Sequence, residues 1–336
     1  MNTCCFVICY FGELPSNLDL VLHTCAANPE YNWLLFTDDH SEHAYPKNFQ
    51  VKYITFSGMY AYIQNKFDFT IQLNNPRKLC DFKPAYGYLF SDYLMDFPFW
   101  GYCDLDQFFG ALHDFIPFDF LNQYDKIFSL GHMTIFRNCK RMNNLFMTEY
   151  VNANAFLTSY KQVYQQAKGM CFDEWPSNQV NINVLAEQEG IKSYHGYPMI
   201  DVLPKRSYFV GSEFDAATHQ WLVQNNKYFV VCWKQGKISI INRFESGSSS
   251  QEVCYVHIQK RNLKYIAGNE DKLGQFLITP NRIIPIYGDN EKINYNLIIH
   301  LQKMYSLFHV DEIRWKMKTG YSLLKHRFNK YIRKIE

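Results

Sequence analysis

Two aspartates follow a strongly apolar segment in the middle of the chain. Residues 97–103 read Phe-Pro-Phe-Trp-Gly-Tyr-Cys, and Asp104-Leu105-Asp106 comes directly after them. The segment is typical of a buried strand. Alternate side chains of an extended strand point the same way, so Asp104 and Asp106 would share a face. Carboxylate oxygens are ligands for Mg²⁺ and Mn²⁺. The sequence therefore predicts a divalent metal site here, and the buried approach disfavours two merely solvated acids.

An imidazole much later in the sequence is a further candidate ligand. His257 lies near the end of an apolar run that begins at Val253, and Lys260 and Arg261 follow it. Imidazole suits Mn²⁺, and basic side chains can hold a departing diphosphate together with a metal. A surface or core histidine is the alternative, and the residues alone leave both interpretations open.

Two more segments combine charge with aromatic side chains. Residues 77–84 (Arg-Lys-Leu-Cys-Asp-Phe-Lys-Pro) bring Lys78, Asp81 and Lys83 within six positions. These side chains could contact phosphate and sugar hydroxyls, or form a solvated helix start. Residues 172–175 (Phe-Asp-Glu-Trp) hold acids between aromatics, which suits carbohydrate recognition. His132, Trp100 and Trp175 could line the same pocket.

The elements that must position these residues alternate between strand and helix. A continuous apolar run, Cys4 to Tyr10, predicts a buried strand. A helix over 16–28 and strands over 32–36 and 51–56 are expected to follow, which indicates an α/β domain with a mainly parallel sheet. Ligands gather at the carboxyl ends of such strands, so we expect the loops at 11–15, 37–39 and 104–106 to share one rim. Later elements are expected as helices over 78–92 and 142–168, a strand at 126–129 with a turn at 130–132, a hairpin over 227–241 and a strand over 253–258.

Composition excludes several classes of protein. The 336 residues are 47% hydrophobic, which is ample for a full core. No 18-residue apolar run and no signal-peptide pattern is present, so neither a transmembrane helix nor a signal peptide is predicted. The ten cysteines form no Cys-x-x-Cys pair, which favours buried thiols in a reducing cytoplasm over zinc or disulfide frameworks. The net charge is only +2, and eight basic residues lie in 314–335. That profile predicts no nucleic-acid partner.

Seven motifs, taken together, resemble bacterial capsular and cell-surface polysaccharide glycosyltransferases of the GT-A fold. They are Cys-Tyr-Phe-Gly-x-Leu-Pro, Thr-Asp-Asp, Lys-Leu-Cys-Asp-Phe-Lys-Pro-Ala-Tyr-Gly, Phe-Trp-Gly-Tyr-Cys-Asp-Leu-Asp, Leu-Gly-His, Phe-Asp-Glu and His-Ile-Gln-Lys-Arg. The similarity covers roughly residues 4–285. More distantly, the chain is similar to retaining lipooligosaccharide galactosyltransferases and glycogenins.

The resemblance implies a UDP-sugar donor, UDP-glucose or UDP-galactose, with Mn²⁺ or Mg²⁺ as cofactor. It implies metal ligands at Asp104, Asp106 and His257. Catalytic candidates are Asp173, Glu174 and His132; the distant relatives carry a Gln- or Asp-containing motif at the place of the two acids. Implied contacts to the nucleotide sugar are Tyr10, Phe11, Gly12, Thr37, Asp38, Lys78, Asp81, Lys83 and Lys260.

The resulting expectation is a Rossmann-like GT-A domain over residues 1–310 and a basic amphipathic tail over 311–336. The enzyme would transfer a hexose to a glycan or lipid-linked saccharide of a surface polysaccharide. The late histidine favours retention of configuration over inversion, and the residues alone leave both open. The enzyme would be cytoplasmic and peripheral at the inner face of the membrane. A sugar nucleotidyltransferase would need a Gly-rich phosphate loop, for which Phe-Gly-Glu-Leu-Pro is a poor match. A non-catalytic carbohydrate-binding protein is the other alternative.

The tail gives the first testable prediction. Apolar side chains recur at helical spacing from Leu324 through Phe328 to Ile335, among basic residues. Such a helix binds an anionic lipid surface with about 1 kcal/mol per basic residue. Deleting residues 314–336 should abolish co-sedimentation with anionic liposomes and leave donor hydrolysis in solution intact. Unchanged sedimentation would contradict a membrane role for the tail.

Overall fold

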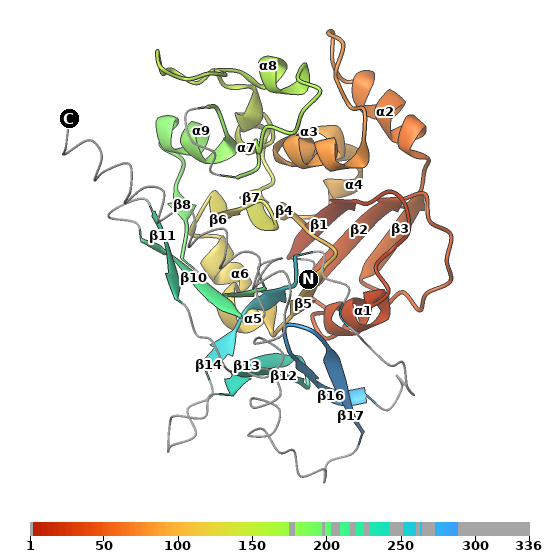
Figure 1. The fold of residues 1–336 in the computed structure, drawn as a ribbon. Coiled ribbons are helices and arrows are strands. Elements are labelled where there is room, and N and C mark those ends of the chain that lie inside the picture. The colour runs from red at the N-terminus through yellow and green to blue at the C-terminus, as the bar shows by residue number, and fades with distance from the viewer. Residues whose placement is uncertain are drawn as a thin grey trace, which may run out of the picture. The chain divides into compact units, whose positions relative to one another are not determined.

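The computed structural model describes residues 3–174, 179–196, 199–202, 209–215, 220–224, 229–241, 251–259, 263 and 273–287. These residues group into two compact units. The first comprises the described residues before 198 with a short segment around 214–220, and the second comprises the remainder. The first unit is an α/β structure built on a seven-stranded sheet, as the alternating sequence pattern predicted (Figure 1).

The seven-stranded sheet runs in the order β3-β2-β1-β4-β7-β6-β8. Its strands are β1 (Cys4–Cys9), β2 (Tyr31–Thr37), β3 (Phe49–Tyr53), β4 (Phe99–Cys103), β6 (Lys126–Leu130), β7 (Met133–Arg137) and β8 (Ser193–Tyr194). β1 pairs in parallel with β2 and β4, β2 pairs in parallel with β3, and β7 is antiparallel to β4 and β6. The carboxyl ends of β1, β2 and β4 therefore meet at one edge, which confirms the predicted rim.

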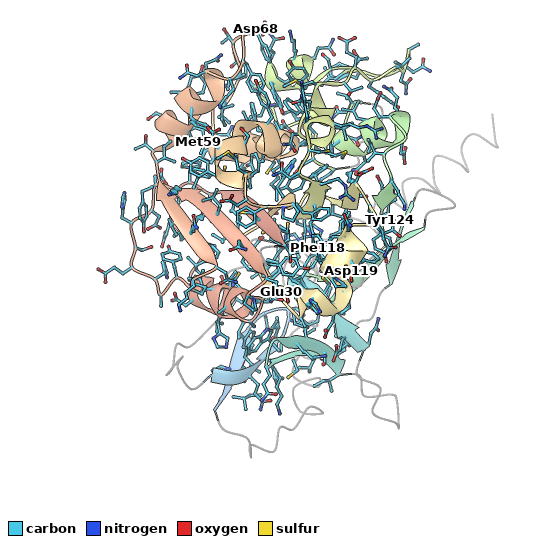
Figure 2. The ribbon with its side chains drawn as sticks, turned by 180° about the vertical axis from the view of Figure 1, so that it is seen from behind. Glu30, Met59, Asp68, Phe118, Asp119 and Tyr124 are labelled. Atoms are coloured by element: carbon cyan, nitrogen blue, oxygen red, sulfur yellow. The ribbon has the colours of Figure 1, made fainter. Side chains whose placement is uncertain are left out.

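Both faces of this sheet are covered. On one face, Phe6 of β1 packs against Tyr31 and Trp33 of β2 and against Phe109 of β5 (Gln107–Phe109). Helix α1 (Leu18–Ala26) contacts β2, β3 and β5 on that side. Val7, next along β1, joins the core on the other face, where Met59 of α2 (Phe56–Gln64) packs (Figure 2). The alternation along β1 thus fixes a layered fold with the sheet in the middle.

The second face is built from short helical pieces rather than long helices. They are η1 (Pro76–Ala85, a 3₁₀ helix), α3 (Tyr86–Leu89), α4 (Ser91–Leu94), α7 (Lys140–Asn143), η2 (Leu145–Met147, also 3₁₀), α8 (Tyr160–Tyr164) and α9 (Ile182–Gln188). Two further short helices, α5 (Leu112–Phe115) and α6 (Phe118–Leu121), precede β6. The helix expected over 78–92 is therefore a 3₁₀ helix followed by two single turns. Pro84 lies inside the first piece and favours this interruption.

The helix expected over 142–168 is wrong. Asparagines in this stretch bond locally, as when Asn152 Oδ1 accepts from the backbone N–H of Asn154 at 3.0 Å. Such side chains compete with helical hydrogen bonds. The backbone instead folds back, and the N–H of Tyr150 donates to the carbonyl of Thr158 at 2.7 Å. Only α8 remains helical after it, and Ser159 begins it with a capping box.

The second unit contains an antiparallel sheet in the order β14-β13-β12-β16-β17. Its strands are β14 (Gln251–Val253), β13 (Lys237–Ile241), β12 (Val230–Lys234), β16 (Leu273–Ile278) and β17 (Ile283–Tyr287). β12 and β13 form the predicted hairpin, and both turn residues, Gln235 and Gly236, have positive φ, at 49° and 82°. The expected strand over 253–258 is divided between β14 and β15 (Tyr255–His257). β15 lies beside β9 (Met199–Asp201), with β10 (Val210–Asp215) and β11 (Gln220–Gln224) beyond it.

The cysteines of the chain are thiols rather than disulfide partners. All ten cysteines are free and most are buried, as predicted, although Cys171 is exposed. Burial raises the pKa of the Cys5 thiol to about 12, so this thiol stays protonated at neutral pH. In the described part of the chain no helix has the length and apolar character needed to span a bilayer. The predicted tail over 311–336 lies outside the described residues.

One lysine in the core is held without a carboxylate in hydrogen-bonding contact. Lys126 at the start of β6 is 0% exposed, and its Nζ donates to Asn183 Oδ1 at 2.7 Å and to the carbonyl of Phe128 at 2.5 Å. Phe128 has a φ of 70°, and the pairing of β6 with β7 is irregular at this point. The amine thus stabilises a local distortion of the strand. Burial lowers the pKa of Lys126 to about 7, with Glu187 opposing the shift.

This lysine predicts how stability depends on pH. Its folded pKa lies below its unfolded value, so above pH 7 the unfolded chain binds more protons and the free energy of unfolding should rise with pH. Denaturant titrations between about pH 7 and 8.5 should show the wild type gaining up to about 1.4 kcal/mol per pH unit relative to Lys126→Met. The exposed Lys161→Met change is the matched control and should run parallel to wild type. Parallel curves for Lys126→Met as well would contradict a lowered pKa.

Candidate functional site

The acidic pair lies where the sequence predicted it. All five residues of β4 are buried, and Asp104 follows the strand directly. The N–H of Asp104 donates to the carbonyl of His132 at 3.0 Å, which ties the end of β4 to the turn between β6 and β7. Asp104 is half-buried and Asp106 is 7% exposed. Two carboxylates with so little solvent around them need compensating charge.

Asp104, Asp106 and His257 form a group that could hold a metal ion. Each offers one ligand atom, and these atoms all lie within 4.8 Å of one another. Two carboxylate oxygens with one imidazole nitrogen suit Mn²⁺, and the carboxylates also suit Mg²⁺. The donor set therefore fits the divalent cofactor expected from the sequence without selecting one ion.

Lys83 compensates the charge of Asp104 from within the first unit. Its Nζ donates to Asp104 Oδ1 at 2.6 Å and to the carbonyl of Gly131 at 2.7 Å, and it lies 3.6 Å from Asp173 Oδ2. Burial acts to lower the pKa of Lys83, but the charge of Asp104, followed by Cys80 and Asp173, holds it well above its ordinary value. The lysine is therefore a permanent cation between two acids.

The structure separates the two acids of the Phe-Asp-Glu motif. Asp173 is 2% exposed and faces Lys83, whereas Glu174 is exposed. Burial raises the pKa of Asp173 to about 7 despite the attraction of Lys83, and the charge of Glu174 adds to the rise. Glu174 is therefore the solvent-accessible acid of the motif, and Asp173 is the acid that faces Lys83.

Gly131 permits this close packing, and the sequence interpretation gave it no role. A Cβ at Gly131 would lie 2.5 Å from Asp173 Oδ2 and 2.6 Å from Glu174 Cγ. Only glycine fits there, and its carbonyl also accepts from Lys83. The sequence carries the signal in the motif Leu-Gly-His, where a glycine stands at the turn before β7. The His132 ring is half-buried, with Nδ1 3.4 Å from Gln107 Nε2.

Lys78 and Asp81 form a buried pair that supports the neighbouring loop. Lys78 Nζ donates to Asp81 Oδ2 at 2.7 Å and to the carbonyls of Val163 and Lys168, both at 2.9 Å. Asp81 in turn accepts from the N–H groups of residues 170 and 172 at 2.9–3.1 Å. The three ammonium protons of Lys78 are thus used within the protein. A 3₁₀ helix repeats every three residues, so Lys78 and Asp81 share a face and Lys83 does not.

The loops after β1 and β2 are bonded to each other at the rim. The N–H of Gly12, with a φ of 91°, donates to Asp38 Oδ1 at 2.8 Å. The N–H of Leu14 donates to Asp39 Oδ2 at the same distance. Hydrogen bonds from Ser41 and Leu14 lower the pKa of Asp39 to about 2, so it remains ionised. Asp39 is an anchor that sequence reasoning missed, although Asp followed two residues later by Ser is a known turn signal.

The other expected nucleotide contacts have mixed environments. Phe11 is 9% exposed and packs edge-on against Phe56, and Thr37 is fully buried. These two residues form the base of the rim loops, while Asp38 and Gly12 are more open. Burial raises the pKa of Tyr10, and the charge of Asp106, followed by Glu13 and Asp39, adds to the rise. Lys260, Arg261 and Trp175 lie outside the described residues.

Residues 6–287 match the Family of unknown function DUF6625, and because the match spans most of the chain, the protein belongs to that family. The matched region includes both acids after β4, Lys83 and His257. No curated protein is similar enough to this chain to count as a match.

The buried Lys78–Asp81 pair gives a prediction that separates a structural role from ligand contact. Lys78→Met leaves a buried carboxylate without its cation and should lower the free energy of unfolding by about 3–5 kcal/mol. Urea denaturation measures this loss. Arg77→Met, at the exposed neighbouring position, is the matched control and should unfold like the wild type. A Lys78→Met protein with wild-type stability but weak UDP binding would instead make Lys78 a phosphate ligand.

Proposed function

We propose that this protein is a metal-dependent glycosyltransferase of the GT-A type, which moves a hexose from a UDP-sugar to a surface-polysaccharide acceptor. The observation that carries the proposal is the grouping of Asp104, Asp106 and His257 within 4.8 Å. The two acids follow a buried strand of a largely parallel sheet, and ligands of such sheets bind at the carboxyl ends of the strands.

The residues of the rim suit the parts of a nucleotide sugar. A divalent cation held there would stabilise the charge of the departing UDP. Lys83 orients the Asp104 carboxylate by its 2.6 Å hydrogen bond and keeps this end of the site from becoming excessively negative. Asp38 and Gly12, bonded to each other, offer polar groups for the nucleoside at the neighbouring loops.

Glu174 and His132 are our candidates for contacting the sugar or acceptor hydroxyl. Glu174 is exposed, and the His132 backbone is bonded to Asp104. Asp173 acts on this region indirectly, because its carboxylate lies 3.6 Å from Lys83 Nζ. The proposed retention of configuration follows from the resemblance, and the anomeric configuration of the first product, followed by NMR, decides it. The expected cytoplasmic location and membrane contact are proposals tied to the tail.

The metal group predicts a common defect in three variants. Asp104→Ala, Asp106→Ala and His257→Ala should each lower Mn²⁺-dependent turnover of the UDP-sugar by orders of magnitude. Each should also make UDP affinity insensitive to added Mn²⁺, because the bridge between protein and diphosphate is lost. Nucleotide release from a panel of UDP- and GDP-sugars measures turnover, and calorimetry measures UDP binding.

Asp68→Ala is the control for these variants. Its side chain is 86% exposed, and Figure 2 shows it at the outer end of the first unit. It should behave like wild type. Binding of saccharide without Mn²⁺-dependent release of nucleotide from any donor would contradict the enzyme and favour a carbohydrate-binding protein. Full Mn²⁺-dependent activity of His257→Ala would make the histidine structural.

A further inference from the structure

The strand pair β9 and β15 places a second carboxylate against His257. The two strands are parallel, and their register aligns Met199 with Tyr255 and Asp201 with His257. All six residues of these two strands are buried. Paired residues of neighbouring strands project to the same side of a sheet. An acid and an imidazole that lie some 55 positions apart in the sequence are thereby brought together among apolar side chains.

Asp201 is held from two directions. Its Oδ1 lies 3.3 Å from His257 Nδ1, and its Oδ2 accepts from Gln259 Nε2 at 2.5 Å. The N–H of Val202 donates to the His257 carbonyl at 3.0 Å, which fixes the backbones. Gln259 has a φ of 44°, in the left-handed region, so the chain turns just after β15 and its side chain reaches back to Asp201.

The Asp201 carboxylate is buried, and its Oδ1 has few contacts among the described residues. Asp201 is 7% exposed, and its Oδ1 makes no hydrogen bond that meets strict geometry within the described residues. Among the described residues, the His257 imidazole lies beside that oxygen. Burying a carboxylate is unfavourable unless a partner compensates it. The burial of Asp201 is therefore understandable if it serves the imidazole.

We propose that Asp201 is a positioning residue for metal binding. Its carboxylate accepts a hydrogen bond from the Nδ1–H of His257, and this leaves the Nε2 lone pair available to the cation. A neutral imidazole carries one N–H, and the group bonded to that N–H decides which nitrogen can bind a metal. A carboxylate behind a metal-bound histidine fixes the ring and makes the ligand more basic. A cation held on Nε2 would make the Nδ1–H a stronger hydrogen-bond donor to Asp201. This inference rests on the metal site of the proposed function.

The experiment measures Mn²⁺ binding to the full chain by electron paramagnetic resonance, with no donor or acceptor present. Asp201→Leu should bind Mn²⁺ roughly 10- to 100-fold more weakly than wild type. Asp201→Asn keeps an oxygen that accepts the Nδ1 proton and should lose less. Thermal unfolding of each variant checks that it is folded. If the Leu variant does not fold, the Mn²⁺ affinity of the near-isosteric Asn variant tests the proposal.

A double-mutant cycle distinguishes positioning from a general structural role. If Asp201 acts through the imidazole, then adding Asp201→Leu to His257→Ala should weaken Mn²⁺ binding no further. Nitrogen-15 NMR of His257 should show the Nδ1–H form in wild type and a mixture of forms in Asp201→Leu. Wild-type Mn²⁺ affinity in both Asp201 variants, or an equal loss in the His257→Ala background, would overturn the proposal.

The same measurements separate this proposal from the proposed function. Coupled Mn²⁺ binding in a protein that hydrolyses no nucleotide sugar would leave the role of Asp201 standing and remove the glycosyltransferase. An active enzyme whose Mn²⁺ affinity is unchanged in the Asp201 variants would support the glycosyltransferase and overturn the role of Asp201. A wild-type chain that binds no Mn²⁺ would overturn both.

Discussion

The Lys83 ammonium is the interaction on which the rim of the sheet depends. It bonds to Asp104 and to the Gly131 carbonyl and lies 3.6 Å from Asp173. Buried acids of like charge repel each other, and removing the cation between them would leave that repulsion uncompensated. The end of β4, the turn before β7 and the acidic loop at 172–174 are thus joined by one side chain. Each of these segments is short, and Lys83 adds a buried charge contact to the backbone hydrogen bonds that fix them.

The Lys78–Asp81 pair performs the corresponding task one turn earlier in η1. It holds the backbone of residues 163–172 by hydrogen bonds from the lysine and to the aspartate. Because 163–172 leads directly into Asp173, the loop that faces Lys83 is anchored by a second ion pair on the same helix. The 3₁₀ repeat sends the two lysines of one motif in different directions, one into the core and one to the rim.

Much of this arrangement could be predicted from the sequence, because local patterns carry it. The buried run before Asp104 and the alternation of strand and helix gave the sheet and the acidic edge correctly. The long helix over 142–168 was wrong because asparagines bonded to their own backbone, which apolar spacing does not reveal. Lys78 and Asp81 fitted a phosphate site by composition, but whether a charge faces solvent or core depends on the helix type. The environment of Asp201 depends on a strand register between distant segments, which no local pattern encodes.

The charges near the end of β4 favour a cation at the rim. Asp104, Asp106 and Glu174 bring three carboxyl groups together here, and the pKa of Asp173 is about 7, while Lys83 is the cation that contacts this cluster among the described residues. The surplus is therefore negative within the first unit, and Lys83 is already bonded to protein oxygens. The described residues of this cluster alone would repel a diphosphate. On the proposed function, a divalent cation held by Asp104 and Asp106 would reverse the local sign, so that an anionic donor would bind together with the metal.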